Sequence, residues 1–306
     1  MIRSEPPHAA VHPQAQPPEG RSASAATGMQ ERFLDAPRPL RYLIGGAGPP
    51  LLLCHGWLGS AENFTTWFDG VGRHRTVIVP DLPGCGDSPA LSGRHTCAAL
   101  ARSLKPLIDA LELDRFDLGG LCLGSGVAFE ALARWPERVD RLILHTPLLD
   151  PTVVRSRFHL QAAVMMSPPV FPVISWLSKQ RLVSDLYKRM VVEGDDVDPA
   201  QAEMNFRNQQ RASHRAQRQW LQDGLRRHDA GLLARHAGQS LIIVAGDDRL
   251  LRCDALERLV TRMPRVSFAS IDDAGHGWNE GFIRRQLGVL DAFLEDQPLP
   301  GAIAAA

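Results

Sequence analysis

A short glycine-flanked stretch offers the clearest candidate for covalent chemistry. The segment GLCLG, residues 120–124, has the G-x-nucleophile-x-G spacing of a sharp strand-to-helix turn, with Cys122 at its centre. Free N–H groups at the start of the following helix would stabilise a thiolate, which can attack an acyl carbonyl. A buried structural cysteine is the alternative interpretation of the same residue.

A nucleophile of this kind needs an imidazole base that is oriented by an acid. His276, in the glycine-flanked segment DDAGHGW, is the candidate base. The segment LIIVAGDDRLL ends its apolar run in two candidate acids. Asp248 is followed, after one residue, by the apolar pair Leu250 and Leu251, which fits an acid-x-apolar-apolar pattern. The loop from Gly246 to Asp248 is one residue shorter than this pattern usually has, so Asp247 remains an alternative. Asp150, after the segment RLILHTP, is a further alternative acid.

Two backbone amides are candidates for holding an oxyanion. The first is the N–H of Trp57, in the turn that follows the predicted strand of the segment LLLCHGW. The second is the N–H of Leu123, the residue directly after the candidate nucleophile. His55 is expected to brace this loop rather than to transfer a proton. Ser125 is a weaker rival nucleophile, because Leu123 stands where its own turn would need a small residue.

The elements that must position these residues alternate along the chain. From residue 38 onward, short apolar segments alternate with amphipathic helical patterns, which predicts an α/β fold: a mostly parallel central sheet with helices on both faces. Function gathers at the carboxyl ends of the strands in such a sheet, and HGW, LCL, GDD and AGHGW all follow predicted strands. Pro106 is expected to kink or divide the helix that contains it.

The alternation defines five segments. We expect a disordered Pro/Ala-rich tail over residues 1–28, the first part of the core over 29–150, and a helical cap or lid over 151–238. The second part of the core covers 239–296, and 297–306 is expected to be a flexible tail.

Composition excludes several classes of function. Lys+Arg and Asp+Glu both total 34, so no net charge favours nucleic acid, and the five scattered cysteines form no metal-ligand spacing. We expect no metal, no cofactor and a reduced, cytoplasmic location. The longest apolar stretch, residues 163–177, is broken by prolines and too short for a membrane span.

The predicted cap offers two groups of candidate binding residues. An acyl or aromatic group could be lined by apolar side chains that could equally form the core of the cap: Met165, Met166, Phe171 and Trp176. A second group recurs at helical spacing and should share one face: Arg207, Arg211, Arg215 and Arg218. That face is either solvated or a dock for coenzyme A or an acyl carrier protein.

The order Cys122…Asp248…His276 resembles the α/β-hydrolase superfamily over roughly residues 38–295. The segment VIVPDLPGCGDSP is also similar to the D-x-x-G-x-G-x-S loop of that superfamily. Cysteine in place of the usual serine resembles dienelactone hydrolases, polyhydroxyalkanoate synthases and some thioesterase-like enzymes. The resemblance implies a hydrolase that acts on an ester, thioester or lactone through an acyl-cysteine. Two alternatives are an acyltransferase with a non-water acceptor and a non-enzymatic ligand binder.

Overall fold

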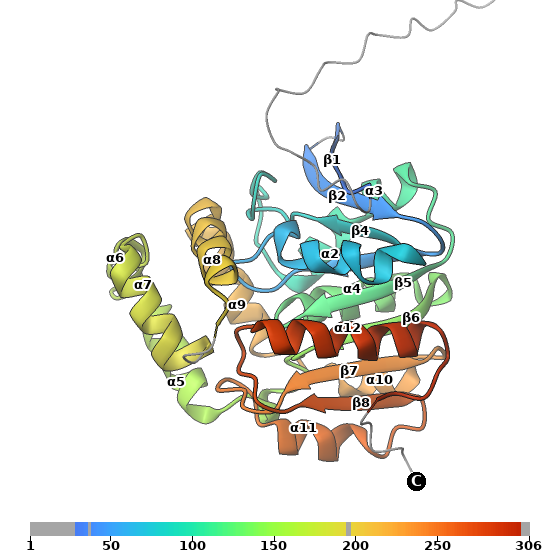
Figure 1. The fold of residues 1–306 in the computed structure, drawn as a ribbon. Helices are drawn as coiled ribbons and strands as arrows, with labels where there is room; N and C mark the ends of the chain where they lie inside the picture. Colours follow the sequence, from blue (N-terminus) through green and yellow to red (C-terminus); the bar gives the residue numbers. More distant parts are fainter. Residues whose placement is uncertain (1–27, 36–37, 194–196, 301–306) are drawn as a thin grey trace, which may run out of the picture.

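A twisted eight-stranded sheet forms the centre of the molecule (Figure 1). The computed structural model describes residues 28–35, 38–193 and 197–300. The strands are β1 (Gln30–Leu34), β2 (Leu40–Gly46), β3 (Pro50–Cys54), β4 (Thr76–Pro80), β5 (Phe116–Leu121), β6 (Val139–His145), β7 (Ser240–Ala245) and β8 (Val266–Ile271). Their order is β1-β2-β4-β3-β5-β6-β7-β8, with β2 antiparallel to both of its neighbours and all other pairs parallel. The predicted fold class is confirmed.

Helices cover both faces of the sheet because alternate strand residues point to opposite sides. Leu52 and Cys54 pack with α2 (Cys97–Ser103), α3 (Lys105–Ala110), α4 (Gly124–Arg134), α10 (Ala230–Arg235) and α11 (Cys253–Val260). Leu51 and Leu53 pack on the other side, against α1 (Thr65–Asp69) and α12 (Glu280–Leu294). Burial on both faces makes the central strands continuously apolar.

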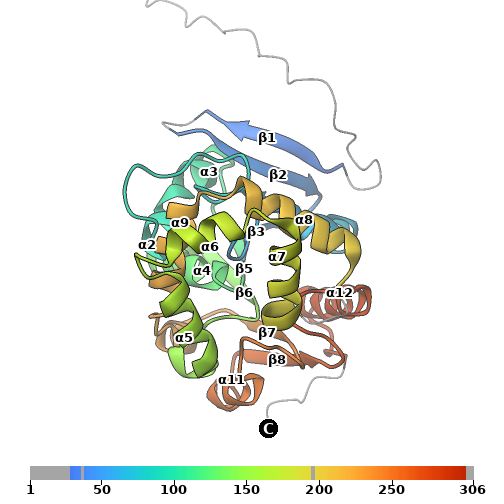
Figure 2. The ribbon, with the colours of Figure 1, turned by 90° about the vertical axis from the view of Figure 1, so that its left-hand side faces the viewer.

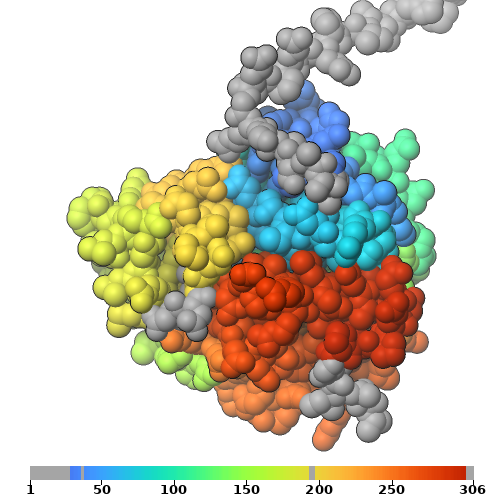
Figure 3. Space-filling model, viewed as in Figure 1, coloured from blue at the N-terminus to red at the C-terminus, as the bar shows by residue number. Residues whose placement is uncertain are grey.

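Further helices connect β6 to β7 and lie beyond the carboxyl ends of the strands (Figure 2). We call the following five helices and one π-helical turn the helical insertion: α5 (Ser156–Met165), α6 (Phe171–Leu177), α7 (Arg181–Tyr187), η5 (Lys188–Glu193), α8 (Pro199–Arg211) and α9 (His214–Gly224). In the space-filling view its yellow and green-yellow atoms form a lobe beside the core (Figure 3). The insertion therefore faces the edge of the sheet where the candidate residues gather.

Two local features differ from or refine the sequence-based expectation. The sequence did not predict β1, because this edge strand is largely exposed and lacks a buried, alternating apolar face. Pro106 does divide the predicted helix: α2 ends at Ser103 and α3 begins at Lys105 with the proline in its first turn. Of the predicted N-terminal tail, only Gly28 lies among the described residues, and the predicted C-terminal tail is described as far as Pro300.

Candidate active site

Cys122 occupies a strained turn between β5 and α4. Its φ is 51°, in the left-handed region that non-glycine residues rarely adopt, and its N–H donates to the His145 carbonyl at 2.8 Å. A Cβ at Gly124 would lie 2.3 Å from the Cys54 carbonyl oxygen, and one at Gly120 would lie 2.6 Å from the Cα of Ser125. Only glycine therefore lets strand and helix approach closely enough to hold the cysteine in this turn.

The Cys122 side chain reaches a cavity, although it is only 9% exposed. Ser125, the rival nucleophile, is fully buried, and its hydroxyl donates to the Cys122 carbonyl. The structure therefore presents the sulfur, and not this hydroxyl, to a ligand.

His276 connects the cysteine to an acid. Its Nδ1 lies 2.7 Å from Oδ2 of Asp248, and its imidazole interacts electrostatically with the thiol of Cys122, which lines the same cavity. Because Nδ1 donates to the carboxylate, Nε2 is the ring atom left for the sulfur. The sequence places these three residues 28 or more positions apart, and the folded sheet brings them together.

The structure distinguishes between the candidate acids. The other oxygen of Asp248, Oδ1, accepts the N–H groups of Leu250 and Leu251 at 2.7 and 2.8 Å, so the buried carboxylate is held in one orientation. Asp247 is exposed and donates its backbone N–H to Ala274. Asp150 accepts from the backbone N–H and hydroxyl of Thr152 and pairs with His228, so its carboxylate does not serve the site.

The pKa values of His276 and Asp248 are both shifted from their usual values. Burial alone would lower the pKa of His276, but the charge and hydrogen bond of Asp248, with the contact to Cys122, raise that pKa well above its usual value. Burial would likewise raise the pKa of Asp248, but His276 and the backbone N–H groups of Leu250 and Leu251 lower it. The two shifts have one cause in common, because the Asp248 carboxylate stabilises the protonated form of the His276 imidazole.

The two predicted oxyanion donors lie at the same cavity. Among the described residues, neither the N–H of Trp57 nor that of Leu123 donates to a protein acceptor, and both residues line the cavity with Cys122. His55 braces this region: its Nδ1 donates to the Gly56 carbonyl, and its Nε2 accepts from the N–H of Leu82 at 3.0 Å. Burial lowers the pKa of His55, which suits a neutral structural imidazole.

The segment that resembles the D-x-x-G-x-G-x-S loop supports this side of the site. Asp81 accepts the N–H groups of Ala61 and Asp87 at 2.7 and 2.9 Å and pairs with Arg41 at 2.9 Å. Gly86 has φ 51°, and a Cβ there would lie 2.0 Å from the Asp81 carboxylate. Its lack of a side chain is therefore required for the loop to close on the aspartate.

Gln217 is a residue that the sequence reasoning missed. Its carbonyl accepts from the Trp57 indole at 3.0 Å, its Oε1 accepts from the N–H of Leu58 at 3.0 Å, and its Nε2 donates to Cys85 at 3.1 Å. One residue of α9 thus holds the loop that carries a candidate oxyanion donor. A glutamine within a polar helical pattern gives no sequence signal for such a role.

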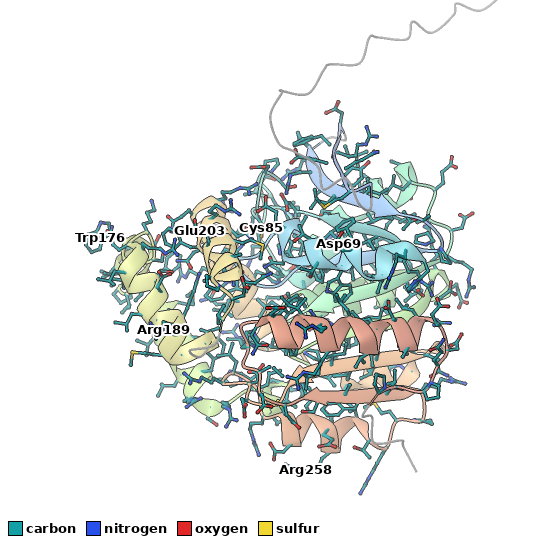
Figure 4. All side chains as sticks on the ribbon, viewed as in Figure 1. Asp69, Cys85, Trp176, Arg189, Glu203 and Arg258 are labelled. Atoms are coloured by element: carbon teal, nitrogen blue, oxygen red, sulfur yellow. The ribbon has the colours of Figure 1, made fainter. Side chains whose placement is uncertain are left out.

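The cavity has a volume of about 420 Å³ and lies between the sheet edge and the helical insertion. Met165, Met166 and Phe171 line it, as the sequence suggested. The prediction for Trp176 is wrong: this side chain is 61% exposed and points away from the core (Figure 4). Helical geometry explains the error, because Phe171 and Ile174 on α6 face the cavity while Trp176 stands on the opposite side of the helix.

The expectation of one arginine-lined face is also wrong. Helix α8 ends at Arg211, and Ser213 caps the separate helix α9, so the four arginines do not follow one helix. Arg211 pairs with Glu62 and Asp87, whereas Arg218 lines the cavity and stacks over Phe171. The four arginines therefore do not form the single basic helix face on which the expected dock for coenzyme A or an acyl carrier protein depended.

The described residues contain no cluster of three His, Cys, Asp or Glu side chains arranged to hold a metal ion. Within the described ranges, each helix is too short or too polar to cross a lipid bilayer.

Residues 49–279 match the sequence model of the alpha/beta hydrolase fold. The chain belongs to this family. A region of 106 residues is 38% identical to 2-hydroxy-6-oxo-2,4-heptadienoate hydrolase of Pseudomonas putida, covering 32% of this chain and 37% of that protein. The chain spans less than half the length of the curated relatives it matches, from 30% to 45%.

Solved alpha/beta hydrolase structures share the fold over most of the chain. A thermophilic esterase from Thermogutta terrifontis has a TM-score of 0.73 and 22% identity, covering 87% of this chain and 98% of that one. A mutant of the N-acyl homoserine lactonase AidH, complexed with N-hexanoyl homoserine, has a TM-score of 0.71 and 18% identity, covering 88% and 97%. At these identities the likeness concerns the fold.

Proposed function

We propose that this alpha/beta hydrolase cleaves an ester, thioester or lactone through an acyl intermediate on Cys122. The observation that carries the proposal is the chain of contacts from Asp248 through His276 to Cys122 at the wall of a cavity. Each group has a defined chemical role in acyl transfer. An esterase and a lactonase are among the proteins that share this fold.

In the first step, the proton of the Cys122 thiol would move to His276, which leaves a thiolate. The thiolate forms a bond to the acyl carbonyl carbon, and the carbonyl electron pair moves to oxygen. The N–H groups of Trp57 and Leu123 then hold the oxyanion, a contribution of about 2.7–4 kcal/mol per donor in related sites. As the oxyanion collapses, the C–O or C–S bond breaks, and the leaving alkoxide or thiolate takes the proton from His276.

Water would complete the cycle. Nε2 of His276 removes a proton from a water molecule, which attacks the acyl-cysteine carbonyl. The C–S bond to Cys122 then breaks, the acid product leaves, and the proton returns to the sulfur. Asp248 fixes the imidazole in the tautomer that both steps need and stabilises its positive charge.

The substrate's acyl portion would be mainly apolar. The cavity wall includes Met165, Met166, Phe171 and Leu221, and methionine suits acyl chains of varied shape because its side chain adapts. We propose that residues 151–238 act as the cap that supplies this wall, with 29–150 and 239–296 as the core. Within this class, a thioester is well matched to thiolate attack, since thiolate is also the leaving group.

Intact-mass measurement tests the proposal. The protein is incubated with a panel of esters, N-acyl homoserine lactones and coenzyme A thioesters, and an added acyl mass that maps to Cys122 is the expected result. Cys122→Ala abolishes both the adduct and turnover. Cys253→Ala, which removes a partly exposed thiol outside the cavity lining, leaves both unchanged. Full turnover by Cys122→Ala would refute the acyl-cysteine mechanism.

An acyltransferase is the second candidate, and the predominantly apolar cavity wall favours it because such a wall disfavours water. Adding alcohol, amine or thiol acceptors after formation of the adduct separates the two reactions. Hydrolysis gives the free acid at a rate that acceptors leave unchanged, whereas transfer gives a new ester, amide or thioester. Reversible binding without any adduct would indicate a non-enzymatic ligand binder.

A further inference from the structure

The outer side of the helical insertion carries an unusual concentration of exposed apolar side chains. Among the described residues, eight of the nine exposed large apolar side chains lie between Leu160 and Met190, and the ninth is Phe33 on β1. Scattered apolar residues are normal on a protein surface, but a contiguous group marks a site of interaction.

The positions follow helical periodicity. Leu160 and Val164 are four residues apart on α5, and Val173 and Trp176 are three apart on α6. Leu182, Leu186 and Met190 continue the pattern at intervals of four along α7 and η5, and Leu182 is 81% exposed. We call these seven side chains the outer apolar face. Each stripe is an ordered apolar side of a helix whose opposite side faces the protein.

Figure 4 shows how one residue of this face, Trp176, is placed. Trp176 lies at the far end of the insertion and projects away from the sheet, and Arg189 lies on the same lobe. Trp176 thus marks a side of the insertion that is exposed and lies away from the sheet.

Charge indicates what that other surface is. From Arg155 to the end of η5 at Glu193, the sequence contains six lysines or arginines and two acidic residues, Asp185 and Glu193. Lys179, next to the α6 stripe, is exposed, as are Arg157 and Arg181. Arg181 pairs with Asp185 and with Glu203 of α8, so part of this charge is neutralised locally. Arg155, Arg157 and Lys179 are exposed and form no ion pair with an acidic side chain among the described residues, so they give the apolar face a positive border.

A second copy of the chain fits this pattern poorly. A twofold interface would bring the same patch together from both subunits and would therefore oppose one basic border to another. An anionic lipid surface instead complements both properties, because apolar side chains enter the boundary of the acyl region while Lys and Arg contact the headgroups.

We propose that the outer apolar face docks the protein on the surface of anionic lipid bilayers or micelles. The inner sides of the same helices line the cavity, through Phe171 and Ile174 of α6 and Tyr187 of α7. Docking would thus set the cavity beside a lipid phase from which amphiphilic molecules can enter. The docking itself does not depend on the proposed acyl chemistry, so it can be measured as binding.

Vesicle cosedimentation of the full chain provides the first test. We expect binding to vesicles of equal parts phosphatidylcholine and phosphatidylglycerol, weaker binding to phosphatidylcholine alone, and weaker binding at high salt because salt screens the headgroup charges. The triple variant Leu182→Ser/Leu186→Ser/Met190→Ser should lose at least about tenfold in vesicle affinity, since each apolar side chain no longer enters the lipid.

Phe33→Ser is the matched control, because Phe33 is similarly exposed but lies on β1, outside the insertion. Its vesicle affinity should equal that of the unaltered protein. Trp176 supplies a second readout that needs no destabilising change: brominated lipids should quench tryptophan fluorescence, and Trp176→Phe should remove most of that quenching.

Absence of binding to both vesicle types would overturn the inference, as would unchanged affinity of the triple variant. A dimer that the triple variant dissociates, measured by analytical ultracentrifugation without lipid, would overturn it in favour of a second copy. Vesicle binding that persists in Cys122→Ala would support docking even if the acyl-cysteine proposal failed.

Discussion

The β5–α4 turn and the outer helices of the insertion differ in how far their apolar side chains are buried. Around the turn, Leu118, Val127 and Phe129 are completely buried, and the backbone of Cys122 is fixed in a strained conformation. On α6 and α7, one side of each helix faces the cavity and the opposite side faces solvent. Large apolar side chains remain exposed on the side that faces solvent.

This difference indicates that the sheet edge positions the candidate reacting groups, whereas the helical insertion supplies the wall that would contact a ligand. Reacting groups need a geometry fixed by dense packing, which the sheet edge supplies to the proposed triad of Cys122, His276 and Asp248. A wall that accepts varied apolar molecules can instead be built from short helices with fewer buried contacts. Changes at the sheet edge should therefore affect chemistry or folding, whereas changes on the outer side of the insertion should affect neither.

The largest expected effect follows from Asp248→Asn. The amide keeps the shape of the carboxylate but neither stabilises the imidazolium nor enforces the correct tautomer, so kcat should fall about 10³–10⁴-fold. The matched control is Asp247→Asn, because Asp247 is the exposed neighbour. Steady-state kinetics on the substrate found by adduct formation measures both variants. Comparable losses in the two would contradict the assignment of Asp248 as the acid.

A pair of tryptophans sharpens the comparison for stability. Trp220 on α9 is 1% exposed and packs in the core, so Trp220→Ala should lower the free energy of unfolding by about 3–5 kcal/mol. Trp176 on α6 is 61% exposed, so Trp176→Ala should change it by no more than about 0.5 kcal/mol. Urea unfolding measures both. A large loss in Trp176→Ala would show that the outer side of α6 is packed in solution.

The buried acid–base pair predicts a pH dependence of stability. Asp248 raises the pKa of His276, a contribution that is complete below about pH 6.5 and disappears as the pH rises through the raised pKa. The lowered pKa of Asp248 gives a contribution that is complete above about pH 4 and disappears as the pH falls through that pKa. The stability difference between the unaltered protein and Asp248→Asn should therefore be greatest near pH 5, on the order of 1.5–3 kcal/mol.

Urea unfolding from pH 3 to pH 9 measures this difference. A gap that is constant across the range would show that the pair does not titrate as the contacts indicate. Asp247→Asn again serves as the control, with no maximum near pH 5.

A further small effect should be a gain in stability. Gly288 lies within α12, and a Cβ at this position would meet no atom within 4 Å. Gly288→Ala should therefore raise the free energy of unfolding by about 0.5–1 kcal/mol through helix propensity. Gly124→Ala is the opposite case, because its Cβ would lie 2.3 Å from the Cys54 carbonyl oxygen. Equal effects of the two substitutions would contradict the close approach of strand and helix at the turn.

Features carried by local patterns could be predicted from the sequence. The sheet, the turn at Cys122 and the position of His276 each depend on apolar runs and glycines that stand close together in the chain. The choice between Asp247 and Asp248 could not be made in this way, because both follow the same strand and only folded geometry shows which carboxylate reaches the imidazole. Strand β1 was missed because pairing with β2, rather than burial, defines it.

Residues whose role depends on helix orientation or on distant partners were also beyond sequence reasoning. Trp176 and Phe171 share one apolar segment, but helical rotation turns only Phe171 toward the cavity. The arginine spacing continued across Ser213, where one helix ends and another begins. Gln217 gained its role only when α9 came to lie against the loop at Trp57.

The contacts of Gln217 connect α9 to the loop at Trp57 in the candidate active site. The same helix contributes Arg218 and Leu221 to the cavity wall, so a ligand that displaces α9 also pulls on the loop that bears the Trp57 amide. In the proposed mechanism, occupancy of the cavity and alignment of the Trp57 amide would thereby be linked through Gln217. Molecules that fit the wall badly would be penalised twice, once in binding and once in the stabilisation of developing negative charge.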